Sequence, residues 1–276
     1  MLTEIPVNDR IQYQSLFYGH LGGFIPDSIL QGHMGRMVAD QADKTFAALE
    51  LPEVKLTILG GHEESASTRT NIRQLKRNSP LIIASPIMRD FVYKFHAGKC
   101  VALERFAFSA DSLRLAHLQG LKEKTPAGFQ VAKIDVPLAE ALKMPKNKFA
   151  KEHGINFESA EDFVNRGVGF CALQGDQVAC VASCFTVCDG AIEIQIDTAR
   201  KFQGKGVATA VAAHLITHCL ENDIIPGWDA ATEISAKFAE KLGYTKTGAY
   251  EMVVYTGSRL LVSLRKTIRW VLGKDQ

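Results

Sequence analysis

The sequence predicts an α/β (α+β) protein in which a mixed, mostly antiparallel sheet is preceded by a smaller α/β domain. Three observations lead to this fold class. Extended apolar runs alternate with segments of helical period in the first half of the chain. Three extended runs follow one another in the second half, and a turn at Gly175-Asp176 joins the first two. A later strand leads through a glycine turn into an alanine-rich helix.

The composition is that of a globular protein. The chain has 276 residues, of which 46% are hydrophobic and 22% charged, so it can bury a sizeable core. Its 32 Lys and Arg residues nearly balance 30 Asp and Glu residues. The resulting net charge of +2 gives no general attraction for nucleic acid, which we therefore do not expect as a partner.

Three features predict a cytoplasmic protein. The first ten residues carry both charge signs and lack the apolar region of a secretory signal, so we expect no export. The longest apolar stretch, Val207–Ile216, is about half of the roughly 20 residues that cross a bilayer, so we expect no integral membrane segment. Six cysteines are too few for a disulfide scaffold in a chain of this length, which favours a reducing compartment.

Short apolar runs predict the elements of the first half. The expected strands are Val54–Leu59, Leu81–Ala84 and Lys99–Ala107, and the expected helices are Glu63–Lys76, Met88–His96 and Ser112–Leu121. Charged and turn-forming residues at Glu123–Pro126 predict a surface connection. We therefore expect an N-terminal α/β domain over residues 1–126.

The pattern becomes sharper after Gly128. A strand at Phe129–Ile134 and helical material over Leu138–Arg166 precede three strands, Val168–Leu173, Val178–Val187 and Ala191–Thr198. We expect these three strands to form an antiparallel meander. The two-residue turn between the first two pairs Cys171 with Cys180, and we expect two reduced thiols there in preference to a disulfide.

A helix–strand–helix–strand series completes the pattern. It comprises a helix over Gly204–Glu221, a strand over Ile224–Ala231, a helix over Glu233–Leu242 that Gly243 ends, and a strand over Tyr250–Tyr255. We expect residues 127–257 to form one domain with the order β-β-β-α-β-α-β from Val168 onward. Apolar residues at helical spacing among basic ones predict an amphipathic helix over 258–276, which docks on protein or, as the alternative, lies on a membrane.

The strand at Ile192–Thr198 and the segment Gln203–Thr209 together predict an anion site. Main-chain N–H groups in the first turn of a helix lack intrahelical acceptors, and the helix dipole adds positive potential there. Glycines at positions 204 and 206 let phosphate oxygens approach the main chain. The Walker and dinucleotide-binding patterns are both absent from the sequence, and a tight turn without a ligand is the alternative interpretation.

This segment resembles the acyl-CoA-binding motif of the GNAT superfamily, Gln/Arg-x-x-Gly-x-Gly/Ala, which Gln203, Gly206 and Ala208 match. The stretch from Thr232 to Tyr244 resembles the second signature of that superfamily, and the likeness covers roughly residues 128–256. The details of these segments are similar to the branch that contains the zwittermicin A resistance acetyltransferase.

The resemblance implies a GNAT fold and an acetyl-CoA-dependent N-acetyltransferase that acts on a primary amine, and the branch named favours a small molecule as the acceptor. It also implies that the strand before the glycine turn splays from the next strand, and that the pantetheine arm enters the gap. The residues implied in cofactor binding are Ile196, Asp197, Thr198, Gln203, Gly204, Lys205, Gly206, Val207, Ala208, Thr209, Thr232 and Ser235.

Two carboxylates are candidates for the base that deprotonates the amine. Strand alternation places Glu193 on the same face as Gln195 and Asp197, near the expected gap, and Asp229 is the second candidate. The alternative for Glu193 is a solvated or hydrogen-bonded strand carboxylate. The general acid is unassigned, because Ala239 stands where the family often has Tyr, and we expect Tyr244 to be structural.

No metal is expected. His214 and His218 have a spacing that zinc sites use, but Leu215 stands where a His-Glu-x-x-His motif needs Glu, and no third ligand is evident. A homodimer is left open. The alternative to an enzyme is a catalytically silent acyl-CoA sensor, which the substitution at Ala239 and the uncertain base both favour.

Overall fold

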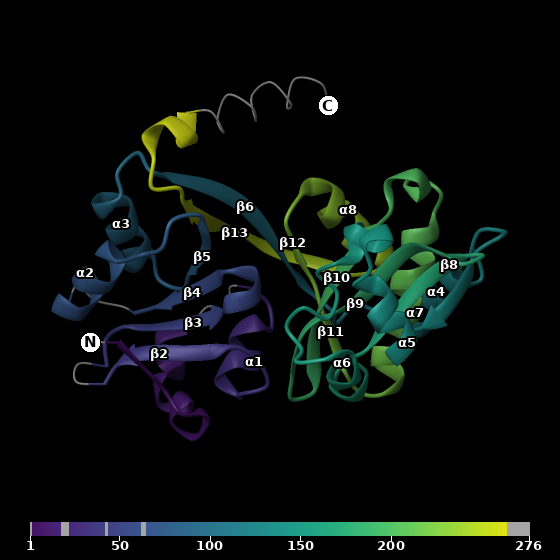
Figure 1. Cartoon of the computed structure of the whole chain (residues 1–276), viewed down its shortest axis with the longest axis horizontal. Coiled ribbons are helices and arrows are strands. Elements are labelled where there is room, and N and C mark those ends of the chain that lie inside the picture. Colours follow the sequence, from purple (N-terminus) through teal and green to yellow (C-terminus); the bar gives the residue numbers. More distant parts are fainter. Residues whose placement is uncertain (1, 18–21, 42–43, 62–64, 264–276) are drawn as a thin grey trace. The chain divides into compact units, whose positions relative to one another are not determined.

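The computed structural model describes residues 2–17, 22–41, 44–61 and 65–263. The chain forms two compact units (Figure 1). The first takes its residues from 1–22, 29–105 and 249–276, and the second from 23–28 and 106–248. Residues 106–126 therefore pack within the second unit, together with a short N-terminal segment.

The first unit contains most of a mixed sheet with helices beside it. Its elements are β1 (Leu2–Glu4), η1 (Val7–Phe17), β2 (Arg36–Asp40), β3 (Ala47–Leu51), η2 (Pro52–Val54), β4 (Leu56–Gly60), α2 (Ala66–Arg73), β5 (Ser79–Ile83) and α3 (Pro86–Phe95). Helix α1 (Ile25–Leu30) and strands β6 (Cys100–Ser109) and β13 (Thr245–Tyr255) run from one unit into the other. The strand order is β1-β2-β3-β4-β5-β13-β6-β12.

The pairing in this sheet confirms a mixed α/β arrangement. β4 and β5 run parallel, whereas β1 to β4 pair antiparallel in succession and β13 pairs antiparallel with β5. Helices α2 and α3 and the sheet share a core of apolar side chains, among them Phe46, Leu59, Ile72, Leu81 and Met88. The predicted strands and helices of this region are present with shifted ends, while β1, β2 and β3 were not predicted.

The second unit is built on a five-stranded sheet. Its elements are α4 (Leu115–Lys122), β7 (Gln130–Lys133), α5 (Val136–Leu142), η3 (Pro145–Ala150), α6 (Ala160–Arg166), β8 (Gly169–Gln174), β9 (Gln177–Cys188), β10 (Ala191–Thr198), η4 (Arg200–Phe202), α7 (Val207–Glu221), β11 (Ile225–Gly227), β12 (Asp229–Ala230) and α8 (Glu233–Leu242). The strand order is β11-β10-β9-β8-β7. Only the pair β10–β11 is parallel among these described strands.

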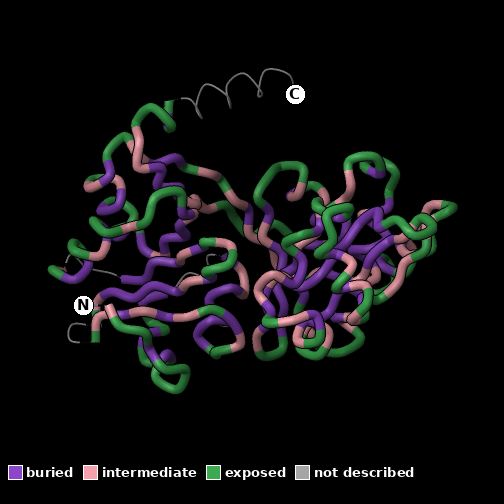
Figure 2. Tube along the Cα trace, in the orientation of Figure 1, coloured by how far each residue is buried: buried purple, intermediate pink, exposed green. Residues whose placement is uncertain are grey.

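Helix α7 packs on β8, β9 and α4, and its side chains supply much of the core. Figure 2 shows buried positions along the central strands of both units. Most residues of β9 are buried, because this strand lies in the middle of the sheet. The predicted antiparallel meander of β8, β9 and β10 is confirmed.

The predicted register of the first hairpin is wrong. The two-residue turn is present, with Gln174 opposite Gln177 and Gly175 at φ +57°. A register shift between Ala172 and Leu173 then pairs Cys171 with Val181, so Cys171 does not face Cys180. A β-bulge adds one residue to one strand, which an alternation pattern cannot show. All six cysteines, which lie in the described part of the chain, are free thiols.

Two other predicted segments are subdivided. The strand expected over Ile224–Ala231 is two strands, β11 and β12, which have different partners. The helical material expected over Leu138–Arg166 is α5, η3 and α6. Of the predicted C-terminal helix, residues 259–263 are helical and residues 264–276 lie outside the described residues. Within the described ranges, no helix combines the length and apolarity that a membrane crossing needs.

Candidate functional site

The strands β10 and β11 separate halfway along β10. Ala191, Ile192 and Glu193 pair with Ile225, Pro226 and Gly227 of β11. Two residues later the chain pairs elsewhere, because Asp229 and Ala230 of β12 face Ala107 and Phe106 of β6. Among the described strands, Ile194–Thr198 therefore pair only with β9. One main-chain edge of this half of β10 is available to an extended ligand.

Gly227 and Trp228 explain why the strands part. A Cβ at Gly227 would lie 2.5 Å from the Phe24 ring and 2.9 Å from the carbonyl oxygen of Ile192, so only glycine allows this close approach. The Trp228 side chain is buried against Phe238 and Tyr244, which turns the chain toward the core. On the other side, the pairing of β9 with β10 shifts register between Glu193 and Ile194.

The glycine turn follows β10 and opens α7. Gln203, Gly204, Lys205 and Gly206 are all exposed. Gly204 and Gly206 have φ of +74° and +81°, and Gly206 is the N-cap of α7. Within the described chain, a Cβ at Gly204 would meet nothing within 4 Å, and one at Gly206 would meet only Pro126 at 3.8 Å. The turn thus leaves open space where a side chain would stand at both glycines, which suits the close approach of an anion to the main chain.

Aromatic packing holds this turn in place. Phe202 is buried, and its ring contacts the ring of Phe129 edge to face. The ammonium groups of Lys201 and Lys205 lie 4.8 and 5.3 Å from the centre of the Phe202 ring. The side-chain amide of Gln203 donates to the carbonyl oxygen of Thr198 at 3.3 Å. Two positive charges therefore lie beside the turn.

Several predicted cofactor-binding side chains have partners within the protein. The Thr232 hydroxyl caps α8 by accepting from the Ser235 N–H at 3.1 Å, and the Ser235 hydroxyl accepts from the Trp228 indole at 3.3 Å. The Thr209 hydroxyl accepts from the Lys241 ammonium at 3.1 Å. Val207 is buried. At these positions the side chains contact other parts of the protein, so the main chain at the start of α7 is the remaining candidate for binding an anion.

Glu193 lies at the last position where β10 and β11 pair. Its side chain is only 3% exposed, and the Phe24 N–H donates to Oε2 at 3.1 Å. A Cβ at Gly23, where φ is +61°, would lie 2.1 Å from Oε2, and one at Gly227 would lie 2.7 Å from the same atom. Two glycine backbones and one N–H group therefore enclose this carboxylate. Asp229 is only partly buried.

The segment that encloses Glu193 was not predicted from the sequence. Gly23 and Phe24 precede Glu193 by about 170 residues, and no periodicity links positions so far apart. The Gly22-Gly23 pair was a signal for a tight turn, but not for what the turn touches. His153 was not predicted as a site residue either. Its Nε2 lies 3.3 Å from Oδ2 of Asp197.

The buried titratable groups near the sheet favour their uncharged forms. Burial raises the pKa of Cys180, Cys184 and Cys219 to about 12. Burial also raises the pKa of Tyr244, whose hydroxyl donates to the carbonyl oxygen of Pro226 at 2.9 Å, as expected for a structural side chain.

His214 and His218 pack on the ring of Phe170, and burial lowers the pKa of both. In the described part of the chain, no three His, Cys, Asp or Glu side chains are grouped as metal ligands.

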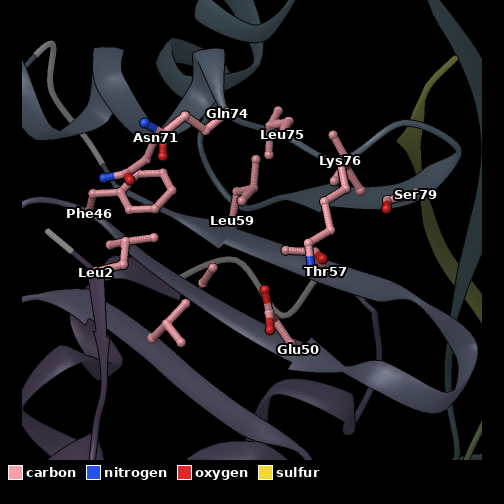
Figure 3. A pocket seen from close by; sticks show the side chains of 13 residues that line it. Leu2, Phe46, Glu50, Thr57, Leu59, Asn71, Gln74, Leu75, Lys76 and Ser79 are labelled. Carbon is pink, nitrogen blue, oxygen red and sulfur yellow. The ribbon is translucent and has the colours of Figure 1, made fainter. Parts of the chain in front are cut away.

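A separate pocket of about 180 Å³ lies within the first unit (Figure 3). Asn71, Gln74 and Leu75 lie on the side of α2 in this view, opposite Leu59 of β4 and Phe46, which directly precedes β3. The other lining residues are Leu2, Val38, Ala48, Glu50, Thr57, Lys76, Ser79 and Leu81. None of the predicted site residues is among them.

The comparisons with known proteins agree with the geometry of the second unit. A family described as GNAT acetyltransferase matches residues 15–253. The uncharacterized N-acetyltransferase YdfB of Bacillus subtilis (strain 168) is 28% identical over 134 residues, which are 48% of this chain and 50% of that protein. The aligned part of the chain thus spans about half the length of this curated relative.

Solved structures share the fold. A GCN5-related N-acetyltransferase-like protein from Streptococcus suis 89/1591 superposes with a TM-score of 0.80 and 26% identity, over 91% of this chain and 100% of that chain. A GCN5-related N-acetyltransferase from Kribbella flavida, with a TM-score of 0.60 and 14% identity over 88% and 98% of the two chains, shows the fold alone. Because the family match spans most of the sequence, the chain belongs to the GNAT acetyltransferase family.

Proposed function

We propose that the chain transfers an acetyl group from acetyl-CoA to a primary amine by direct attack on the thioester. The observation that carries this proposal is the separation of β10 from β11 next to the glycine turn of α7. An open strand edge and an anion-binding helix N-terminus, joined by one short loop, suit a ligand with an extended amide arm and a diphosphate. The family match supports the same cofactor.

The residues of this segment fit acetyl-CoA. The main chain of Ile196, Asp197 and Thr198 offers its free edge to the pantetheine amides, and the N–H groups from Gln203 to Ala208 receive the diphosphate. The left-handed glycines 204 and 206 leave the space that phosphate oxygens need. Lys201 and Lys205 add positive charge. Thr232 and Ser235 contribute through the start of α8, since their hydroxyls have partners in the protein.

Glu193 is the proposed base. When bound, acetyl-CoA supplies the activated acyl carbon, and Glu193 accepts the proton of the attacking amine at a carboxylate oxygen, directly or through one water. The hydrogen bond from the Phe24 N–H fixes the position of Oε2. Because the carboxylate is planar and rigid, this bond also restricts where Oε1 points. Asp229 is the second candidate, since it lies two residues beyond Gly227. Neither route needs a covalent enzyme intermediate.

No side chain is assigned as the general acid. Ala239 is buried in α8, and the hydroxyl of Tyr244 is used by the carbonyl of Pro226. A CoA thiolate is a stable leaving group, so it can depart without a dedicated acid. The absence of this group lowers the rate that we expect but leaves the reaction type unchanged.

The resemblance to the zwittermicin A resistance branch supports a small molecule as the acceptor. We place the acetyltransferase domain at residues 127–257 and the protein in the cytoplasm, as the sequence predicts. A homodimer is compatible with these assignments. The second candidate function is a silent acyl-CoA sensor, which the 3% exposure of Glu193 favours because a closed carboxylate is a poor base for a bulky amine.

Two measurements on the full chain test the proposal. Calorimetric titration with acetyl-CoA reports binding, and thiol release with a panel of small amines, amino sugars and peptides reports transfer. We expect saturable binding and amine-dependent thiol release. Binding without turnover for every acceptor would favour the sensor, and no binding of acetyl-CoA would overturn both functions.

A further inference from the structure

Two consecutive residues after η3 contact the half of β10 that β11 does not cover. The carbonyl oxygen of Glu152 accepts from the Gln195 side-chain amide at 3.0 Å. The Nε2 atom of His153 lies 3.3 Å from Oδ2 of Asp197. Gln195 and Asp197 alternate along the strand and so share one face. The side chains of this face are therefore held from outside the sheet.

His153 is itself fixed from the opposite side. Its side chain has no exposed surface, whereas that of Asp197 is 48% exposed. Its Nδ1 shares a hydrogen bond of 2.7 Å with the hydroxyl of Ser183, which is fully buried on β9. Burying an imidazole costs free energy unless its nitrogens have partners. The contact with Ser183 sets the ring orientation, and the ring then presents Nε2 to Asp197.

The carboxylate of Asp197 is the polar group that faces Nε2 of His153. Within the described residues, Nε2 is buried and makes no well-aligned hydrogen bond, so the carboxylate at 3.3 Å is the group that compensates it. Asp197 pairs through its main chain with Val181 of β9. The side chain of Asp197 thus couples the free edge of β10 to a residue that the core holds rigidly.

We propose that His153 is a positioning residue for the cofactor, which holds Asp197 so that the free edge of Ile194–Thr198 keeps an extended form. The proposal rests on the proposed function, because it names how that edge is prepared for the pantetheine arm. A strand with one neighbour loses order more easily than a strand with two. Fixing the edge before binding lowers the entropy cost of association.

Two substitutions of the same histidine separate its two contacts. The amide nitrogen of His153→Asn reaches the position of Nδ1 and keeps the bond to Ser183, but it falls short of Asp197. The amide nitrogen of His153→Gln reaches the position of Nε2 and keeps the contact with Asp197. We expect Asn to weaken acetyl-CoA binding about tenfold, the scale of one hydrogen bond to a charged group, and Gln to bind nearly as wild type.

A surface variant tests the same step without disturbing the core. Asp197→Ala removes the partner of His153, and we expect the same loss of affinity as in His153→Asn. Because both changes break one contact, the double variant loses no more than either single variant. In both single variants we expect the loss to appear in steady-state kinetics as a rise in the KM for acetyl-CoA. His214→Asn, on the ring of Phe170, is the control for loss of a histidine and keeps wild-type affinity.

Calorimetry with acetyl-CoA, steady-state kinetics and thermal melting decide the outcome. Wild-type affinity in His153→Asn, an equal loss in His153→Gln, or additive losses at positions 153 and 197 would overturn the inference and leave the proposed function in place. A wild-type chain that does not bind acetyl-CoA would overturn the proposed function as well. If His153→Asn fails to fold, Asp197→Ala decides, and unchanged affinity there contradicts the inference.

Discussion

The two halves of β10 differ in what surrounds them. Ala191–Glu193 lie between β9 and β11, and the carboxylate of Glu193 is enclosed by the backbones of Gly23 and Gly227. Among the described strands, Ile194–Thr198 pair only with β9, and the side chains from Gln195 onward are partly or fully exposed. One strand thus holds the enclosed carboxylate that we propose as the base and, a few residues later, the free edge that we propose for the cofactor. The departure of β11 at Gly227 creates the difference.

The largest expected effect concerns the proposed anion site, which follows the open half of β10. The open half is Ile194–Thr198, which β11 does not cover. Gly206→Glu places a negative charge among the N–H groups that should receive the diphosphate. Losing two or more charge-assisted contacts weakens acetyl-CoA binding roughly thousandfold. A Cβ at this position meets only Pro126, at 3.8 Å, within the described chain, so the fold tolerates the change apart from the cost of a left-handed backbone.

The control for this variant is Gly175→Glu in the hairpin turn. Gly175 has φ +57°, and a Cβ there has open space in the described chain, so the backbone cost is similar. Calorimetry should show wild-type affinity for Gly175→Glu and roughly thousandfold weaker affinity for Gly206→Glu, with similar melting temperatures. Equal affinities in the two variants would place the diphosphate elsewhere.

The contrast between the two halves explains what the sequence could predict. The glycine turn, α7 and the meander were found because their signals are local: a φ-positive glycine, a helical period and a two-residue turn. The break between β11 and β12 was missed, since Ile224–Ala231 reads as one extended run. Which strand each half pairs with depends on Phe24, Phe106 and Trp228, which lie far from one another in the sequence.

The site was predictable to the same degree. The motif around Gly206 predicts the main-chain donors, and the place of Glu193 before that motif predicts it as the candidate base; both stay predictions. The partners of the two acidic residues could not be predicted from the sequence. Phe24 reaches Glu193 only through tertiary folding. The same is true of His153 and Asp197. The hydroxyls of Thr232 and Ser235 resemble ligand-binding groups in the sequence, yet they form a helix cap and a bond to Trp228.

The second prediction tests the closed half of β10, Ala191–Glu193, which lies between β9 and β11. Glu193→Gln keeps the size of the side chain and an oxygen that accepts from the Phe24 N–H, but it removes the basic carboxylate. We expect kcat to fall about a hundredfold, the scale of general-base catalysis, with unchanged affinity for acetyl-CoA. The matched variant is Asp229→Asn. A larger loss of kcat there than in Glu193→Gln would make Asp229 the base.

The third prediction concerns the enclosure of Glu193. In Gly23→Ala the new Cβ would lie 2.1 Å from Oε2, so the carboxylate must move. We expect kcat to fall about tenfold, since a displaced carboxylate still accepts the proton but does so less efficiently. Gly190→Ala has the same left-handed backbone, with φ +71°, and no neighbour within 4 Å in the described chain, so kcat should stay near wild type. Equal kcat values for the two variants would show that this enclosure has no part in catalysis.

The smallest effect tests whether the open half is open on one edge only. Cys180 and Cys184 of β9 pair with Thr198 and Ile194, and burial raises the pKa of both thiols to about 12 from a usual value of 9.0. Below pH 9 both states keep these protons, and above it the unfolded chain releases them while the native chain does not. The free energy of unfolding therefore falls as pH rises from 9 toward 12, by up to about 1.4 kcal/mol per pH unit for each thiol. Urea unfolding of Cys184→Ala and of wild type at pH 8 to 10.5 measures this effect. We expect the free energy of unfolding of the variant to fall less steeply with pH. Identical slopes would mean that solvent reaches this thiol and that the pairing of β9 with the open half is loose.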